Sequence, residues 1–146
     1  MNAIGEILPL SHIILDLDIS SKKRLFEEVG KLLADENLSA NDVFECLFAR
    51  EKLGSTGLGH GVAIPHGRHA HVQQMTAAFV RTAEPIDFDA PDNQPVSLVC
   101  VLLVPEAATG AHLELLSHLA SKFSDKTTRE QLLSCGEAAQ VAQILA

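Results

Sequence analysis

Val96-Ser-Leu-Val-Cys-Val-Leu-Leu-Val104 is the most continuously apolar stretch of the chain, and Ser97 is its only polar residue. Side chains alternate between the two faces of a strand, so a strand that is apolar at every position is covered on both faces. We therefore expect residues 96–104 to form the central strand of a sheet that has helices on each side.

Shorter apolar or β-branched segments predict the remaining strands. Proline and acidic residues break up residues 85–89, so we expect only a short edge segment there, followed by a turn at residues 92–95. Residues 12–17, 62–66 and 75–81 are the other strand candidates. With the central segment, the sheet has about five strands.

Helical spacing of apolar residues with capping residues in front of it predicts two helices before this central region. Ser20 and Ser21 are able to cap a helix that ends near Glu36, and Ser39 precedes a second helix that ends at Gly54. After Pro105 the pattern is helical to the end of the chain. The three helices expected there are residues 111–123, 126–134 and 137–145.

Helices and strands do not alternate strictly along the chain, which argues against a doubly wound parallel sheet. We expect an α/β fold with a mixed parallel and antiparallel sheet covered by helices on both faces. No repeat or linker-like segment interrupts the sequence, so residues 1–146 are expected to form a single domain.

Composition excludes several classes of function. The chain has 11 Lys and Arg against 19 Asp and Glu, which gives a formal net charge of −8 and no concentrated basic segment for nucleic acid or anionic lipid. No segment approaches the about 20 apolar residues that cross a bilayer, so we expect no membrane insertion. Cys46, Cys100 and Cys135 are an odd count without CxxC spacing, which is typical of buried thiols in a reducing, cytoplasmic setting.

Glycine dominates Gly54-Ser-Thr-Gly-Leu-Gly-His-Gly61, and we expect this stretch to be an irregular, shaped loop. Part of it resembles a dinucleotide fingerprint. That fingerprint needs a strand before the glycines and a helix after them, whereas here a helix precedes and a strand follows. The loop instead offers backbone amides beside the hydroxyls of Ser55 and Thr56, a combination that suits an anion.

Histidines cluster after this loop. His69 and His71 would share a face of an extended segment and could chelate a metal, but Arg68 lies beside them and no Cys or carboxylate stands at ligand spacing in the sequence. A solvated loop without a metal is the expectation. His66 differs, because Pro65 stiffens the chain before it and Gly67 lets the chain turn away after it.

His112 would occupy the third position of a helix capped by Thr109. The free amides and positive dipole end of such a helix disfavour a protonated ring and suit a phosphate. From residue chemistry alone His66 is either a functional imidazole or a satisfied structural one, and both interpretations stay open.

Residues 50–68 read Arg50-Glu-Lys-Leu-Gly-Ser-Thr-Gly-Leu-Gly-His-Gly-Val-Ala-Ile-Pro-His-Gly-Arg68. This motif resembles the IIA proteins of the mannitol/fructose class of the bacterial phosphoenolpyruvate-dependent phosphotransferase system, and among them the nitrogen-regulatory IIA proteins. The similarity also covers Asp92-Asn-Gln-Pro-Val-Ser-Leu-Val99, Leu102-Leu-Val-Pro105 and His112-Leu-Glu-Leu-Leu-Ser117. It extends over essentially the whole chain.

The resemblance implies that His66 accepts a phosphoryl group on Nε2 from a histidine-containing phosphocarrier protein. It implies that Arg50 pairs with the phosphoryl oxygens and that His112 is a second active-site histidine, while Arg68 stands where such proteins often have lysine. Phosphorylation would control regulatory targets, for which the family suggests potassium-transport or sensor-kinase components.

For transfer between two imidazoles the protein mainly needs in-line positioning and donors for three equatorial oxygens. Arg50, the loop amides including that of Gly57, and the hydroxyls of Ser55 or Thr56 are the candidate donors. No magnesium or other cofactor is expected, because the sequence offers no acidic cage near His66.

The phosphocarrier would need an apolar surface around His66, for which Leu58, Leu113 and Ile64 are candidates, although each is equally suited to the core. Two other functions stay open. One is a sugar-specific IIA subunit that passes phosphate to a fructose or mannitol IIB domain. The other is a histidine-rich metal-binding module or hydrolase with an ion at His66, His69 and His71.

Overall fold

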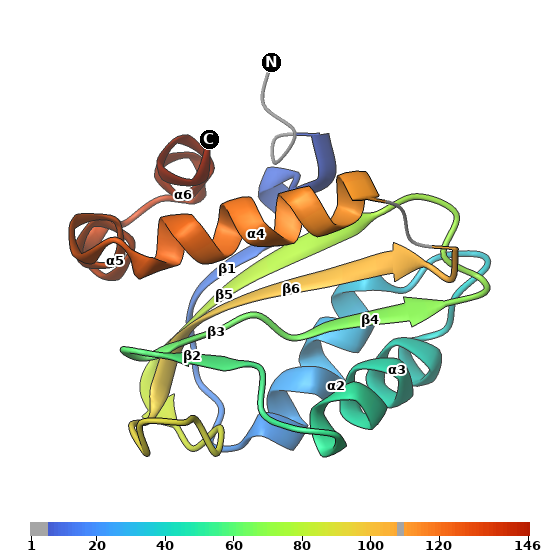
Figure 1. Cartoon of the computed structure of the whole chain (residues 1–146), viewed down its shortest axis with the longest axis horizontal. Helices are drawn as coiled ribbons and strands as arrows, with labels where there is room; N and C mark the ends of the chain where they lie inside the picture. Colours follow the sequence, from blue (N-terminus) through green and yellow to red (C-terminus); the bar gives the residue numbers. More distant parts are fainter. Residues whose placement is uncertain (1–5, 108–109) are drawn as a thin grey trace.

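The computed structural model describes residues 6–107 and 110–146, apart from the side chain of Ala111. Strand β6 (Val96–Pro105) runs through the middle of the sheet, with β5 (Thr76–Ile86) on one side and β3 (Val62–Ala63) and β4 (His66–His69) on the other (Figure 1). The side chains of residues 98–103 are almost completely buried. The predicted central strand is therefore confirmed.

The sheet is mixed, as predicted, and has six strands among the described residues. Strand β1 (Ile13–Leu17) follows the short helix η1 (Leu10–His12) and pairs in parallel with β5, which is antiparallel to β6. Strands β3 and β4 both run parallel to β6, and β2 (Gly57–Gly59) pairs antiparallel with β3.

Two helices cover one face of the sheet. The side chain of Ser21 caps α2 (Lys22–Leu33), and Ser39 forms a capping box with Asp42 at the start of α3 (Ala40–Lys52). These caps satisfy amides that the first helical turn leaves without partners, which explains why both helices begin after a serine.

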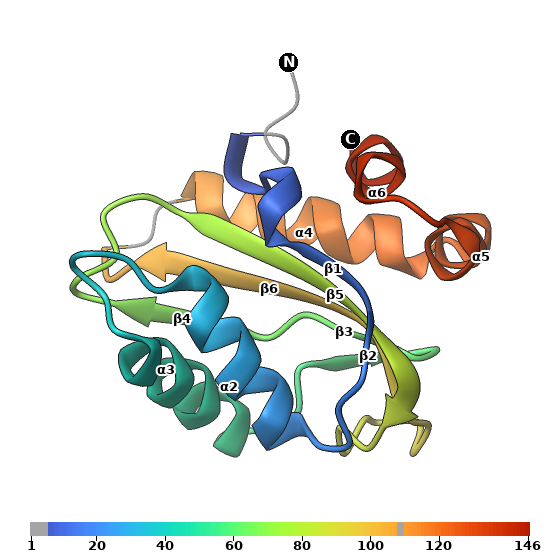
Figure 2. The same cartoon turned by 180° about the vertical axis from the view of Figure 1, so that it is seen from behind.

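The opposite face is covered by the C-terminal helices (Figure 2). Asp125 caps the second of them, and Glu137 with Gln140 caps the third. Their bounds are α4 (Gly110–Ser124), α5 (Lys126–Ser134) and α6 (Ala138–Leu145). Each face has its own hydrophobic cluster, so the sheet separates two cores. Helices on both faces were predicted and are confirmed.

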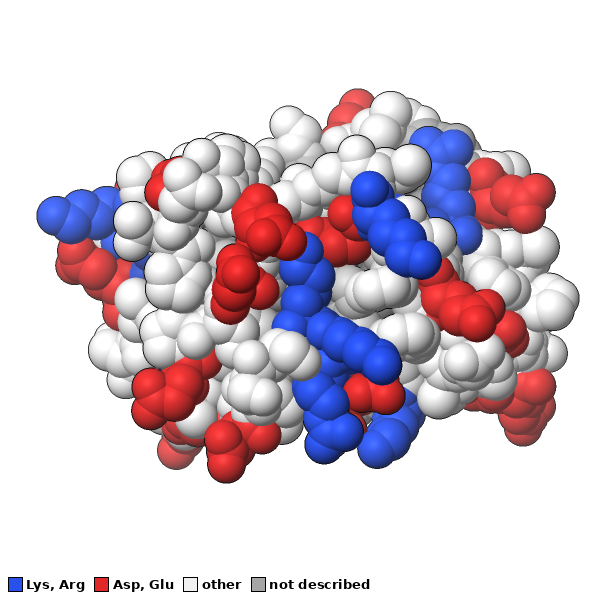
Figure 3. Space-filling model, turned by 90° about the horizontal axis from the view of Figure 1, so that it is seen from below, with Lys and Arg blue, Asp and Glu red and all other residues white. Residues whose placement is uncertain are grey.

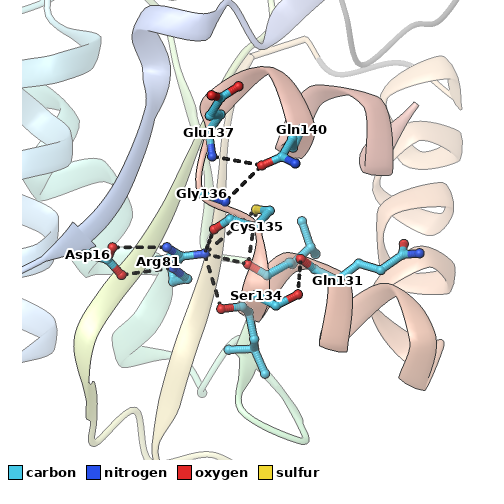
Figure 4. A network of polar contacts seen from close by, with 10 residues as sticks. Asp16, Arg81, Gln131, Ser134, Cys135, Gly136, Glu137 and Gln140 are labelled. Carbon is cyan, nitrogen blue, oxygen red and sulfur yellow. Dashed lines mark hydrogen bonds and ion pairs between the residues drawn. The ribbon is translucent and has the colours of Figure 1, made fainter.

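Arg81 fastens the C-terminal helices to the sheet (Figure 4). It projects from β5, is buried, and its Nη1 donates to the carbonyl oxygens of Leu132 at 3.0 Å and Leu133 at 3.3 Å and to that of Cys135, where α5 ends. Its Nε and Nη2 each donate to the carboxylate of Asp16 at 3.1 Å. A cation at a helix C-terminus is favoured by the dipole, so this residue holds α5 in place.

Residues 85–89 are not the short edge segment that proline and charge suggested. Strand β5 continues to Ile86, which pairs with Val96 after an irregularity in the register. Phe88 is completely buried in the cluster beneath α2. Burial of these two apolar side chains outweighs the local preference of Pro85 and the aspartates for a turn.

The glycine-rich segment also differs from expectation, because residues 57–59 form a strand. His60 and Gly61 both have positive φ, 57° and 80°, as the two central residues of a tight I′ hairpin turn require. The amide of His60 donates to the carboxylate of Asp92 at 2.9 Å. The expectation of a wholly irregular loop was wrong, since these glycines make a hairpin between β2 and β3.

The three cysteines are free thiols. Cys100 and Cys135 are buried as predicted, and burial raises the pKa of the Cys100 thiol to about 12. Cys46 on α3 is only half-buried, against the prediction. It lies against β4, beside the candidate site.

Candidate functional site

His66 begins β4, and its place depends on a break in the strand before it. The predicted strand at residues 62–66 is two strands, because Ile64 and Pro65 interrupt the pairing of β3 and β4 with β6. Pro65 has no amide hydrogen, and its carbonyl accepts a hydrogen bond from the amide of Leu102 at 2.9 Å. The break presents His66 at the start of a strand and not, as predicted, at the end of one.

The hydrogen bonding of His66 identifies its free nitrogen. Nδ1 lies 2.9 Å from the carbonyl oxygen of Ile64. A carbonyl oxygen only accepts, so Nδ1 carries the hydrogen and Nε2 of the neutral ring keeps its lone pair. The chain two residues upstream therefore orients the imidazole and selects its tautomer.

Gly67 does not turn the chain away, as the sequence suggested, but lies within β4. A Cβ at this position would be 2.5 Å from Sγ of Cys46 and 3.3 Å from the Cys46 carbonyl oxygen. The Cys46 thiol also donates to the carbonyl oxygen of Arg68 at 3.1 Å. Glycine is needed because α3 and β4 approach each other closely here.

Alternation along β4 brings His66 and Arg68 to one face, since they pair with Leu102 and Val104 of β6. These residues line a cavity of about 90 Å³ together with His112. Because α4 begins at Gly110, His112 occupies its third position, as predicted. The proposed cap, Thr109, lies outside the described residues. Three of the predicted site residues thus share one hollow.

A second and larger hollow, of about 390 Å³, also contains His66. It brings in the remaining predicted residues, Arg50, Ser55, Thr56 and Gly57. Nη1 of Arg50 donates to the carbonyl oxygen of Gly54 at 3.0 Å, which holds the guanidinium over the start of the loop. Residues that sequence reasoning did not single out complete the wall: Leu116, Ser117 and Ala120 of α4.

Glu51 is the residue that sequence analysis missed. It is a buried carboxylate, and Thr56 donates to it through the hydroxyl at 2.6 Å and through the amide at 3.2 Å. Nζ of Lys22 lies 2.9 Å from the same carboxylate. A buried carboxylate with these partners fixes the loop between α3 and β2. The sequence signal that could have identified Glu51 is its position directly after Arg50.

The loop hydroxyls are already engaged in this conformation. Ser55 donates to the carbonyl oxygen of Phe88 at 2.7 Å and accepts from the amide of Gly57 at 3.0 Å, while the Thr56 hydroxyl hydrogen goes to Glu51. These groups shape the loop. A direct contact between them and a phosphate would require an exchange of partners.

The rim of the larger hollow is partly apolar. Leu58 is 44% exposed and Leu113 60% exposed, whereas Ile64 is 3% exposed and belongs to the core. Two of the three residues considered for a docking surface are thus available to a partner.

Basic side chains gather on the face where the beginning of α2 meets the end of α3 (Figure 3). The first turn of α2 is Lys22-Lys-Arg24, and the last turn of α3 carries Arg50 and Lys52. The ion pair between Lys22 and Glu51 joins these two helix ends. The chain is acidic overall, but this local surface beside Arg50 is suited to an anion.

The structure does not assemble the metal site considered at His66, His69 and His71. His66 and His69 are three positions apart in a strand, so they project to opposite faces. His69 and His71 lie instead beside Asp42 of α3. Tertiary contact thus supplies a carboxylate that the sequence did not place next to them.

Comparison with known families shows to which family the chain belongs. Residues 6–146 match the model of the phosphoenolpyruvate-dependent sugar phosphotransferase system EIIA 2 family. The chain belongs to this EIIA 2 family. It is 43% identical over 147 residues to a nitrogen regulatory protein of Pseudomonas aeruginosa, covering 99% of this chain and 96% of the relative. The resemblance to nitrogen-regulatory IIA proteins is therefore confirmed.

Other members of the EIIA 2 family agree with this assignment. A fructose-specific EIIA component of Haloferax volcanii is 35% identical, covering 98% of this chain and 94% of the relative. The crystal structure of the nitrogen regulatory protein IIA-Ntr from Neisseria meningitidis superposes with a TM-score of 0.97 at 67% identity, over 99% of this chain and all of the other. The predicted mixed α/β fold is thereby confirmed. Among the described residues of this EIIA 2 member, no helix combines the length and apolar character required to cross a bilayer.

Proposed function

We propose that this EIIA protein accepts a phosphoryl group on Nε2 of His66 from a histidine-containing phosphocarrier protein, and that its phosphorylation state controls regulatory target proteins. The observation that carries the proposal is the hydrogen bond from Nδ1 of His66 to the carbonyl oxygen of Ile64. It leaves Nε2 as the nucleophilic nitrogen of a ring whose orientation is already set.

The transfer exchanges one phosphorus–nitrogen bond for another. The lone pair of Nε2 forms a bond to phosphorus while the bond to the carrier's imidazole breaks, and its electron pair returns to the carrier's ring. His66 keeps its hydrogen on Nδ1, so positive charge develops on the ring next to the Ile64 carbonyl dipole. The protein mainly has to align the two imidazoles with the phosphorus and to compensate the charge on the three equatorial oxygens.

Arg50 is the main candidate for that compensation, because it lines the same hollow as His66 and carries a planar set of donors. Glu51 acts as a positioning residue through Thr56 and the loop. Arg68 and His112 line the smaller cavity together with His66, and in this proposal they bind phosphoryl oxygens. Ser55, Thr56 and Gly57 would bind phosphate only after releasing their present partners.

Docking of a protein donor is supported by the surface around this hollow. Leu58 and Leu113 supply exposed apolar contacts, and Arg50 belongs to the basic surface that the beginning of α2 and the end of α3 form. Exposed apolar side chains around a reactive group are typical of a protein interface. The proposed donor is therefore a protein and not a small phosphorylated metabolite.

The regulatory role rests on relatives that are named nitrogen regulatory proteins. A second candidate is a sugar-specific subunit that forwards phosphate to a IIB domain, and the fructose-specific relative supports it. Incubating the phosphorylated chain with purified fructose and mannitol IIB domains separates the two. Retention of the phosphoryl group on this chain favours regulation, whereas rapid transfer to either IIB domain favours the transport role.

Acceptance is tested by incubating the chain with phosphoenolpyruvate, the first enzyme of the system and the phosphocarrier. We expect one acid-labile, base-stable adduct in the wild type and none in His66→Ala. His118→Ala is the matched control, because it removes an exposed histidine of α4 that does not line either hollow. An adduct of undiminished yield in His66→Ala overturns the assignment.

His112 is expected to assist and not to accept. In His112→Ala we therefore expect acceptance to persist while onward transfer or the response of the target weakens. The measurement is the time course of labelling followed by chase with unlabelled carrier. Complete loss of acceptance in this variant would show that His112 is needed for the first transfer.

A further inference from the structure

The side of β4 that faces α3 carries a cluster that phosphoryl transfer does not use. Asp42, His69 and His71 each offer a ligand atom, and these three atoms lie within 4.8 Å of one another. Asp42 comes from the first turn of α3, His69 from the end of β4, and His71 from the turn that follows. We propose that these three side chains form a binding site for a divalent transition-metal ion, with Zn²⁺ as the best match.

The donor set supports zinc over harder cations. Two imidazoles and one carboxylate are a common protein set for Zn²⁺ with a fourth position open to water, whereas Mg²⁺ and Ca²⁺ prefer oxygen ligands throughout. Ligand atoms in a tetrahedral zinc site are about 3.4 Å apart, given metal–ligand distances of about 2.0–2.1 Å. The side chains therefore need to close by roughly an ångström, which is within reach of rotamer changes at an exposed turn.

Asp42 is prepared to act as a ligand. It accepts a hydrogen bond from the amide of Ser39 through Oδ2 at 3.2 Å, and this contact holds the side chain in place. Asp42 is thus held in the first turn of α3, within reach of both imidazoles.

The two histidines are already next to each other. Their ring centroids are 5.0 Å apart with an interplanar angle of 64°. His69 is half-buried and His71 exposed, so the site has one anchored imidazole and one with freedom to close on an ion. The role of Asp42 in the helix cap explains where Asp42 lies. It does not explain why two imidazoles face the Asp42 carboxylate.

Metal binding requires one change in the turn. Nδ1 of His69 now accepts a hydrogen bond from the amide of His71 at 3.0 Å. A metal on Nε2 would shift the ring hydrogen to Nδ1, where it would oppose that amide hydrogen. The contact between His69 and His71 must therefore open, or the ring must rotate so that Nδ1 faces the ion.

The test is equilibrium dialysis of untagged, metal-free protein against Zn²⁺, with metal content measured per chain. We expect one ion per chain in the wild type, and at least tenfold weaker binding in His69→Gln, His71→Gln and Asp42→Asn. Asparagine retains the oxygen that accepts from Ser39, so the third variant removes charge and keeps the helix cap.

Two matched control variants test whether the ion binds at this cluster and not at another histidine. His118→Gln removes an exposed histidine of α4, and His66→Gln removes the histidine on the other face of β4; both should bind Zn²⁺ as the wild type does. Binding that is not saturable, or that falls equally in either control, overturns the proposal. Zinc should also raise the Tm of the wild type and leave that of His71→Gln unchanged, because only a folded site binds.

An independent signal is the amide resonance of His71. It should shift on zinc addition to the wild type, because its hydrogen bond to His69 opens. An unchanged amide at saturating zinc would contradict this geometry. Phosphoryl acceptance by His69→Gln should equal that of the wild type, so failure of the metal proposal and failure of the His66 assignment give different results.

Discussion

The two faces of β4 differ in accessibility and packing. On the face toward α4, His66 and Arg68 border open hollows and remain accessible to a partner. On the face toward α3, Gly67 is pressed against Cys46, and His69 lies beside Asp42. The four consecutive residues of β4 thus combine an accessible surface on one face with a packed contact on the other.

A short strand can be fixed on one face by packing and present side chains on the other. Side chains alternate with a period of two, so a rigid attachment on one face fixes the side chains that project from the other. The close packing of α3 against Gly67 holds the backbone from which His66 projects. Packing against α3 thus fixes the backbone at His66, and the hydrogen bond to the Ile64 carbonyl oxygen orients its ring.

The largest expected effects test whether the two faces form one cooperative unit. Phe79 on the α4 side and Phe26 on the α3 side are both completely buried. Truncating either one to alanine should destabilise the protein by about 3–5 kcal/mol, because a large cavity is left in a core. Urea denaturation followed by circular dichroism measures both variants.

A single transition with an unchanged m-value is expected for Phe79→Ala and for Phe26→Ala. Separate transitions for the two variants would show that the layers on the two faces of the sheet unfold independently. The surface substitution Leu133→Ala on α5 is a suitable reference, since that side chain is half exposed and leaves no cavity.

A smaller effect is expected from Gly67→Ala. The new Cβ would meet Cys46 at 2.5 Å, so α3 and β4 must separate, and overpacking of this kind costs about 1–3 kcal/mol. Phosphoryl acceptance by His66 should fall as well, because its support moves. Thermal unfolding and the labelling assay are the two measurements.

Gly136→Ala is the matched control for Gly67→Ala, because nothing lies within 4 Å of a Cβ there. Combining Gly67→Ala with Cys46→Ala should recover part of the lost stability by removing Sγ, although the contact with the Cys46 carbonyl persists. Wild-type stability in Gly67→Ala alone would contradict the close packing described here.

The smallest expected effect is on the loss of folding stability at low pH. Hydrogen bonding from Ser39 lowers the pKa of Asp42 below its ordinary value. The ionised carboxylate therefore contributes stability that is present above the unfolded-state pKa of about 3.9 and is lost as pH falls through the lower folded-state value. In urea titrations from neutral pH to pH 3, Asp42→Asn should lose less stability than the wild type. Parallel curves would show that the Ser39 contact does not favour the ionised form.

Local sequence was sufficient for elements whose signals lie within a few residues. Ser21 and Ser39 begin the helices α2 and α3 as predicted, since a capping serine acts on amides two or three positions away. The central strand β6 was equally clear from its continuous apolar character. Burial of Phe88, by contrast, depends on packing beneath a helix that is distant in sequence, and local turn preferences gave the opposite prediction.

The features of the candidate site also fall into those set by local sequence and those set by distant packing. The EIIA 2 family and the place of His66 within its motif could be predicted from the amino-acid sequence, because the motif residues are contiguous and their order carries the information. Three features came from the tertiary structure alone: which nitrogen of His66 is free, that His66 shares one hollow with Arg50 and another with His112, and that Asp42 lies beside His69. Those outcomes depend on hydrogen bonds and packing between segments remote in sequence, whose geometry no local pattern of residues specifies.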